Sequence, residues 1–99
     1  MRFQLQTRNR IEDICPKLLS IFRKHIGESN KISTENLYYK IYNEQLENKL
    51  EHWFKWNIVR SGMNFLRRKS NCFIVNKSDG SSYSFYVLNT ISDVRRFYS

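Results

Sequence analysis

The chain has 99 residues, of which 40% are hydrophobic and 15% aromatic, and it carries a formal charge of +8. This length allows one domain with one compact core and excludes a large multidomain enzyme, and the apolar content is that of a folded chain. No apolar run reaches the roughly 18 residues that a transmembrane helix needs, so we expect no membrane partner.

The positive charge is concentrated in the second part of the chain. Residues 1–54 carry 9 basic and 7 acidic side chains, a balance of +2, whereas residues 55–99 carry 8 basic and 2 acidic ones, a balance of +6. Such a basic half is typical of a protein that binds a polyanion, because neutralised phosphates release their counterions. The alternative at this point is a solvated basic surface that keeps the protein soluble.

The first ten residues alternate weakly between apolar and polar side chains and include three arginines. The segment 1–10 is therefore expected to be a short edge strand or a basic N-terminal arm. We expect residues 11–99 to form a single domain. The start of the chain lacks the unbroken apolar stretch of a secretory signal, so we expect no cleaved signal. The two cysteines lie in apolar patterns, from which we expect a reduced, intracellular protein.

The first strong element is a helix over residues 11–26, where apolar side chains recur every three or four positions. Asp13 is the expected N-cap, which places Pro16 in the first turn, where a missing N–H costs little. Gly27 is expected just beyond the C-terminus of this helix.

Ser33 is the expected N-cap of a second helix. Ile32 before it and Leu37 four residues beyond it have the spacing of a hydrophobic staple. The expected buried face of this helix consists of Leu37, Tyr38, Ile41 and Tyr42.

A third helical segment is predicted after the second, with an apolar side and an acidic side. Its acidic side would make one face of the helix negative. The expected buried residues are Leu46, Leu50, Trp53 and Phe54, and the expected acidic ones are Glu44, Glu47 and Glu51.

The fourth segment, residues 57–69, has a narrow apolar stripe formed by Val59, Met63 and Leu66. Polar and basic side chains recur on the opposite face, which no acidic residue interrupts. An apolar back and a basic front suit a helix that enters a nucleic-acid groove. The outward residues are Arg60, Asn64, Arg67 and Arg68.

Two β-prone runs follow, residues 72–75 and 83–88, and the polar connection 76–82 between them contains an Asp-Gly pair that signals a hairpin. Because this connection is longer than a tight turn, we expect it to project and to carry Lys77. Ser92 is a candidate cap for a short final helix that carries Arg95 and Arg96.

This order of elements resembles the winged helix-turn-helix superfamily. The resemblance rests on the stretches STENLYYKIYN, NIVRSGMNFLRRKS and CFIVNKSDGSSYSFYVL, and as an order of elements it covers about residues 11–90. It implies an α+β, winged-helix-like fold of three to four helices followed by a C-terminal β-hairpin and a short terminal helix. One departure is that the connection from Asn43 to Lys55 is expected to hold an extra helix.

In that superfamily the helix before the hairpin enters the major groove and the hairpin tip contacts the backbone or the minor groove. The residue chemistry agrees, because Arg matches two acceptors on guanine or phosphate and Asn can pair with adenine. We expect a transcriptional regulator, viral, plasmid or archaeal from its small size, that binds duplex DNA without a cofactor and is not an enzyme. The candidate DNA-binding residues are Asn57, Arg60, Ser61, Asn64, Arg67, Arg68, Lys69 and Lys77.

The potential metal ligands do not have the spacing of a metal site. Cys15, His25, His52 and Cys72 are all far apart in sequence, so no metal is predicted. Both cysteines lie in apolar patterns, which indicates reduced, buried thiols.

Aromatic residues cluster between Tyr38 and Trp56, and Tyr39 and Trp56 fall off the expected apolar stripes. An exposed aromatic surface here would suit a homodimer or another protein partner. Two other functions stay open. One is a winged-helix protein-interaction module, such as a viral or mobile-element inhibitor of a host complex, and the other is a small RNA-binding protein or ribonuclease toxin.

Overall fold

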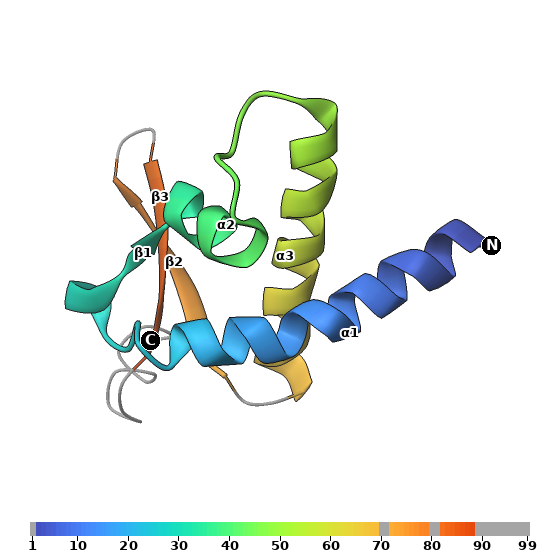
Figure 1. Cartoon of the computed structure of the whole chain (residues 1–99). Coiled ribbons are helices and arrows are strands. Elements are labelled where there is room, and N and C mark those ends of the chain that lie inside the picture. Colours follow the sequence, from blue (N-terminus) through green and yellow to red (C-terminus); the bar gives the residue numbers. More distant parts are fainter. Residues whose placement is uncertain (1, 70–71, 80–81, 89–99) are drawn as a thin grey trace.

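The computed structural model describes residues 2–69, 72–79 and 82–88. They form an α+β fold of three α-helices and a three-stranded antiparallel sheet (Figure 1). Among these residues, no helix combines the length and apolar character needed to cross a membrane. The elements are α1 (Arg2–Phe22), the 3₁₀ helix η1 (Glu28–Asn30), β1 (Ile32–Ser33), α2 (Thr34–Tyr42), α3 (Leu50–Lys69), β2 (Ile74–Asp79) and β3 (Ser82–Val87).

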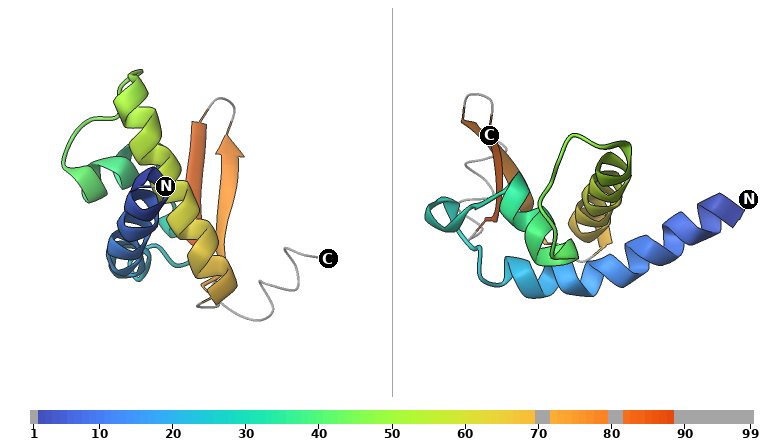
Figure 2. Two further views of the ribbon diagram at one scale, coloured as in Figure 1. Left: turned by 90° about the vertical axis from the view of Figure 1, so that its right-hand side faces the viewer. Right: turned by 45° about the horizontal axis from the view of Figure 1, so that its top comes forward.

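The sheet has the order β1-β3-β2, so the last strand lies between the other two. Phe85 of β3 is opposite Ile32 of β1 on one side and Asn76 of β2 on the other. The three helices lie on one side of the sheet, and the N-terminal half of α1 projects beyond the rest of the described fold (Figure 2).

The core lies between the helices and the sheet. Burial of these apolar side chains supplies the main stabilisation of the fold, at about 25 cal/mol per Å². It also fixes α3 with one face inward and the opposite face toward solvent. The most deeply buried residues are Leu18, Phe22, Leu37, Tyr38, Val59, Met63, Leu66 and Ile74.

The second helix is confirmed as predicted. Ser33 is its N-cap, and the Asn36 backbone N–H donates to Ser33 Oγ over 3.2 Å. Ile32 and Leu37, the two residues of the predicted staple, are both buried in the core. The buried face of α2 also includes Tyr38 and Ile41, and Tyr42 is half-buried.

The first helix begins much earlier than expected. α1 starts at Arg2 and runs without a break through residue 11, so residues 2–10 are helical and do not form the edge strand that was one of the two expectations. These residues contain no Gly or Pro that would stop a helix, and their weak alternation was misleading. Asp13 is therefore not an N-cap, and Pro16 lies inside the helix, where it cannot donate the usual hydrogen bond.

α1 also ends earlier than expected, at Phe22 rather than residue 26. The chain then turns, and Gly27 adopts a φ of 85° that favours glycine. This turn brings Gly27 to the end of β3, where its N–H donates to the Val87 carbonyl over 2.8 Å. The turn is thus tied to the sheet instead of extending the helix.

The predicted third and fourth helices are one helix, α3, and residues 43–49 form a loop. The fold therefore has three helices, and the extra helix expected in the α2–α3 connection is absent from the described residues. The C-cap of α2 is Asn43, which has the left-handed φ of 55°. The expected burial of Leu50, Trp53 and Phe54 is wrong, because the buried stripe of α3 begins at His52 and Trp56.

The predicted hairpin is confirmed, but its strands are longer than expected. β2 extends to Asp79 and β3 begins at Ser82, and these two residues pair with each other. The prediction of a long projecting loop over 76–82 was wrong, because residues 76–79 belong to β2 and Ser82 belongs to β3. Lys77 therefore lies within β2, opposite Ser84. The final helix expected from Ser92 lies outside the described residues.

Candidate nucleic-acid interface

The second half of α3 has one buried and one exposed face. Val59, Met63 and Leu66 are almost completely buried, as the spacing predicted. The exposed face contains no acidic residue, and α3 has none after Glu51. Its exposed polar residues are Asn57, Arg60, Ser61, Asn64, Arg68 and Lys69.

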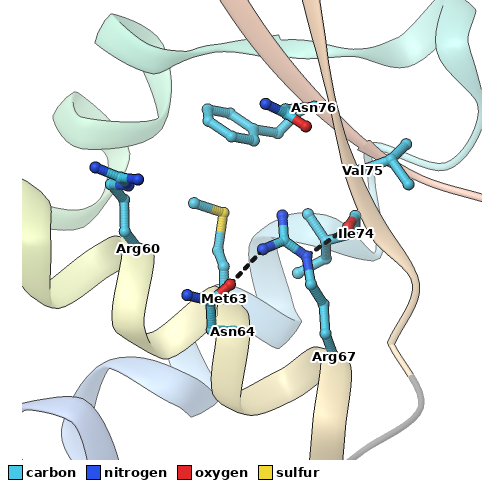
Figure 3. A pocket seen from close by; sticks show the side chains of 8 residues that line it. Arg60, Met63, Asn64, Arg67, Ile74, Val75 and Asn76 are labelled. Atoms are coloured by element: carbon cyan, nitrogen blue, oxygen red, sulfur yellow. Dashed lines mark hydrogen bonds between the residues drawn. The ribbon is translucent and has the colours of Figure 1, made fainter.

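Arg67 differs from its neighbours because it is half-buried and bridges α3 to the hairpin. Its Nε donates to the Ile74 carbonyl over 2.6 Å and its Nη1 donates to Asn64 Oδ1 over 2.6 Å (Figure 3). This planar fork suits two acceptors held at fixed positions. Sequence spacing placed Arg67 on the outward face but gave no signal for the contact with β2.

A hollow of about 280 Å³ lies between α3 and the β2–β3 hairpin. Arg60 stands on its α3 side and Asn76 lies across from it on β2 (Figure 3). None of the described residues that line it is acidic, so its electrostatic character is positive. The lining consists of Arg60, Met63, Asn64, Arg67, Ile74, Val75, Asn76 and Phe85.

Lys77, the predicted hairpin-tip residue, is not at the tip. Its Nζ forms an ion pair with the Glu28 carboxylate of η1. The Lys77 side chain therefore lies beside η1 instead of projecting from the hairpin tip. The structure brings the predicted residues of α3 together and leaves Lys77 outside that group.

Of the three acids predicted to form a negative helix face, Glu44 and Glu47 lie in the α2–α3 loop, and Glu51 lies in the first turn of α3. Glu44 Oε1 accepts hydrogen bonds from Lys55 Nζ over 2.8 Å and from Tyr38 Oη over 2.7 Å. These two bonds hold the pKa of Glu44 below its ordinary value, and the bond from Lys55 has the larger effect. Burial and the Glu44 carboxylate raise the pKa of Tyr38. The cluster anchors the loop to the start of α3.

His52 belongs to the same cluster and is buried. Its Nδ1 accepts a hydrogen bond from the Glu47 backbone N–H over 2.9 Å, and its Nε2 lies 3.5 Å from Glu44 Oε1. Both ring nitrogens are therefore engaged within the fold, which indicates a structural role. Across the described residues, no three potential metal-ligating side chains come together.

Both cysteines are unpaired thiols. Cys15 is buried and Cys72 is half-buried, and burial raises the pKa of each. Since the thiolate is the reactive form of cysteine, a raised pKa disfavours nucleophilic attack by either side chain.

The first half of α3 exposes apolar side chains. Leu50, Trp53 and Phe54 are 74%, 47% and 51% exposed, and we refer to these three residues as the apolar end of α3. Trp53 Nε1 donates to Asn48 Oδ1 over 3.0 Å, which holds the indole against the loop. Two aromatic residues were expected to be exposed. Tyr39 is exposed, whereas Trp56 is buried, with its ring centroid 5.8 Å from that of Phe85.

No family model, curated protein or solved structure matches this chain. Three features of the described residues bear on the chemistry of the site. These are an acid-free polar face on α3, a positively charged hollow beside it, and an exposed apolar group at the other end of the same helix.

Proposed function

We propose that this protein binds duplex DNA through α3 and the β2–β3 hairpin, as a winged-helix transcriptional regulator. The observation that carries the proposal is the exposed, acid-free face of α3 from Asn57 to Lys69. The element order α1-β1-α2-α3-β2-β3, with β1 paired to β3, is compatible with a winged helix. Because α3 is one continuous helix, the extra helix expected in the α2–α3 connection, which would have departed from the winged-helix order, is absent from the described residues.

The residues of this face divide into two roles. Arg68 and Lys69 in the last turn supply charge for phosphates, and Asn57 and Ser61 supply uncharged hydrogen-bonding groups for base edges. Asn64 has a narrower role than the sequence predicted. Because its Oδ1 already accepts from Arg67, it contributes its Nδ2 donors, which match acceptors such as guanine N7 and O6.

The test measures binding of labelled duplex DNA, single-stranded DNA and structured RNA at a series of salt concentrations. Duplex affinity should be highest and should fall steeply as salt rises. The variant R68Q should weaken duplex binding, whereas K17Q should not. Lys17 loses the same charge, but it lies on α1, which packs against the opposite side of α3 at Gly62.

Two outcomes would overturn the proposal. Duplex affinity that does not respond to salt would exclude phosphate contacts, and equal effects of R68Q and K17Q would remove α3 from the interface. Preference for RNA, or cleavage of the labelled RNA, would instead favour the RNA-binding or ribonuclease function.

A protein-binding function is the second candidate, and the apolar end of α3 favours it. Leu50, Trp53 and Phe54 follow one another at helical spacing and leave a large apolar surface in water. A homodimer of the DNA-binding protein would bury this surface, and so would a different protein partner. The two are distinguished by whether the chain alone forms a dimer.

A further inference from the structure

We propose that the hollow between α3 and β2 is an oxyanion seat that holds one phosphate group of a nucleic-acid strand. Arg60 of α3 and Asn76 of β2 are the groups that would bind it from opposite sides (Figure 3). The choice of a nucleic-acid phosphate rests on the proposed function. The seat itself rests on the side chains around the hollow.

The charge of the lining selects an anion. Two arginines and two asparagines line the hollow, and none of the described residues around it carries a negative charge. Guanidinium groups match the oxygens of a phosphate in a planar, two-point arrangement, and amide N–H groups donate to the remaining oxygens. An anion in this position would therefore meet complementary groups from both α3 and β2.

The apolar part of the lining is a poor site for a base. Met63 and Ile74 are each 1% exposed and Phe85 is 7% exposed, so they present little surface for a ring to stack on. They instead form a low-polarity floor beneath the charged side chains. Such a floor strengthens the attraction between a guanidinium and an oxyanion relative to open water.

Arg67 acts as a positioning residue for the seat. Its hydrogen bonds to the Ile74 carbonyl and Asn64 Oδ1 fix a second positive charge at the edge of the hollow. The bond to the Ile74 carbonyl also links α3 to β2, whereas the bond to Asn64 lies within α3 and orients the guanidinium. The Arg67 side of the hollow is therefore preformed, and little conformational entropy is lost there when a ligand enters.

The location gives the seat a role in docking. A strand held here passes between the exposed face of α3 and the hairpin, so one bound phosphate sets the position of α3 relative to the bases. Phosphate contacts of this kind position a protein without reading sequence. We therefore expect loss of the seat to weaken binding to every duplex equally.

The first experiment measures the slope of log affinity against log salt for R60Q. Losing one phosphate contact should reduce the magnitude of the slope by about 0.9, with the same affinity loss on two duplexes of different sequence. R60K, which keeps the charge, should retain the slope, and K17Q serves as the matched control off the site. An unchanged slope in R60Q would overturn the phosphate seat. If the wild-type protein nevertheless binds the duplex, the proposed function stands.

The second experiment uses inorganic phosphate alone and does not depend on DNA binding. In a W53F background Trp56 is the one remaining tryptophan, and its ring lies 5.8 Å from Phe85 in the lining. Saturable phosphate-dependent fluorescence that R60Q abolishes supports the seat. If duplex binding fails but this signal persists, the ligand is a free phosphate compound, and the nucleic-acid source is wrong. Absence of the phosphate signal overturns the seat, as does an unchanged salt slope for R60Q in the first experiment.

Discussion

Gly62 of α3 lies so close to Leu18 of α1 that a Cβ atom added at Gly62 would come within 2.8 Å of Leu18 Cδ1. It would also come within 3.0 Å of Ile14 Cγ2. Glycine at this position therefore lets the two helices approach each other. Because α1 occupies this side of α3, the polar residues on the opposite side remain exposed for a partner.

Gly62→Ala is expected to destabilise the protein by about 1 kcal/mol. Overpacking of a core costs about 1–3 kcal/mol, which exceeds the gain of roughly 1 kcal/mol from replacing a helical glycine. Urea unfolding measures the change. In a Leu18→Ala background, which removes the nearest atom, the same substitution should be neutral or stabilising. An equal penalty in both backgrounds would show that the contact with Leu18 is not its cause.

Ser33→Ala is expected to lower the free energy of unfolding by about 1 kcal/mol, because the Asn36 N–H loses its acceptor at the start of α2. Ser33→Gly should cost only a few tenths of a kcal/mol. Thermal unfolding of the two variants separates the cap from other effects of the position. A larger loss in the glycine variant would contradict the capping role.

Glu44→Gln is expected to destabilise the protein in a pH-dependent way. Hydrogen bonds from Lys55 and Tyr38 lower the pKa of Glu44, so the folded state favours the ionised carboxylate. This contribution is fully present above the ordinary pKa of 4.5 and is lost as pH falls through the lower folded pKa. Unfolding measured over a pH series should show the two proteins converging in acid. A difference that does not change with pH would exclude the carboxylate charge as its origin.

The features that sequence predicted well are local ones. The Ser33 cap depends on residues within one turn, and the stripe Val59, Met63 and Leu66 depends on one helical period. The prediction failed where the choice was between two apolar stripes on one helix. The helical spacing of Leu50, Trp53 and Phe54 predicted that they are buried together, but the stripe that continues from Val59 toward the N-terminus runs through Trp56.

Contacts between residues far apart in the chain left no signal in the sequence. The ion pair of Lys77 with Glu28 joins β2 to η1 across 49 positions, so a residue expected at an exposed hairpin tip is held beside η1. The hollow likewise depends on contacts between different elements, because its two sides come from α3 and β2. The exposed face of α3 could therefore be predicted, whereas the seat beside it could not.

The apolar end of α3 is expected to mediate self-association. Replacing Leu50 and Phe54 by Glu places charges on this surface, so any dimer that buries it should dissociate. Light scattering across a concentration series measures the change in mass, and Tyr83→Glu, at an exposed position of β3 outside the aromatic region 38–56, is the control. A monomeric wild-type protein would exclude the homodimer and direct attention to a different protein partner.

Arg67→Lys is expected to weaken the link between α3 and β2 while keeping the positive charge. A lysine ammonium cannot reproduce the planar fork that reaches the Ile74 carbonyl and Asn64 Oδ1 together. Hydrogen bonds from a charged donor contribute about 1.5–3 kcal/mol when sheltered, and Arg67 is only half-buried, so we expect a loss of about 1 kcal/mol. Amide hydrogen exchange should accelerate in β2 more than in α2. For duplex DNA, affinity should fall without a change in salt slope, because the charge remains and only its positioning is lost. A reduced slope would instead show that Arg67 contacts a phosphate directly.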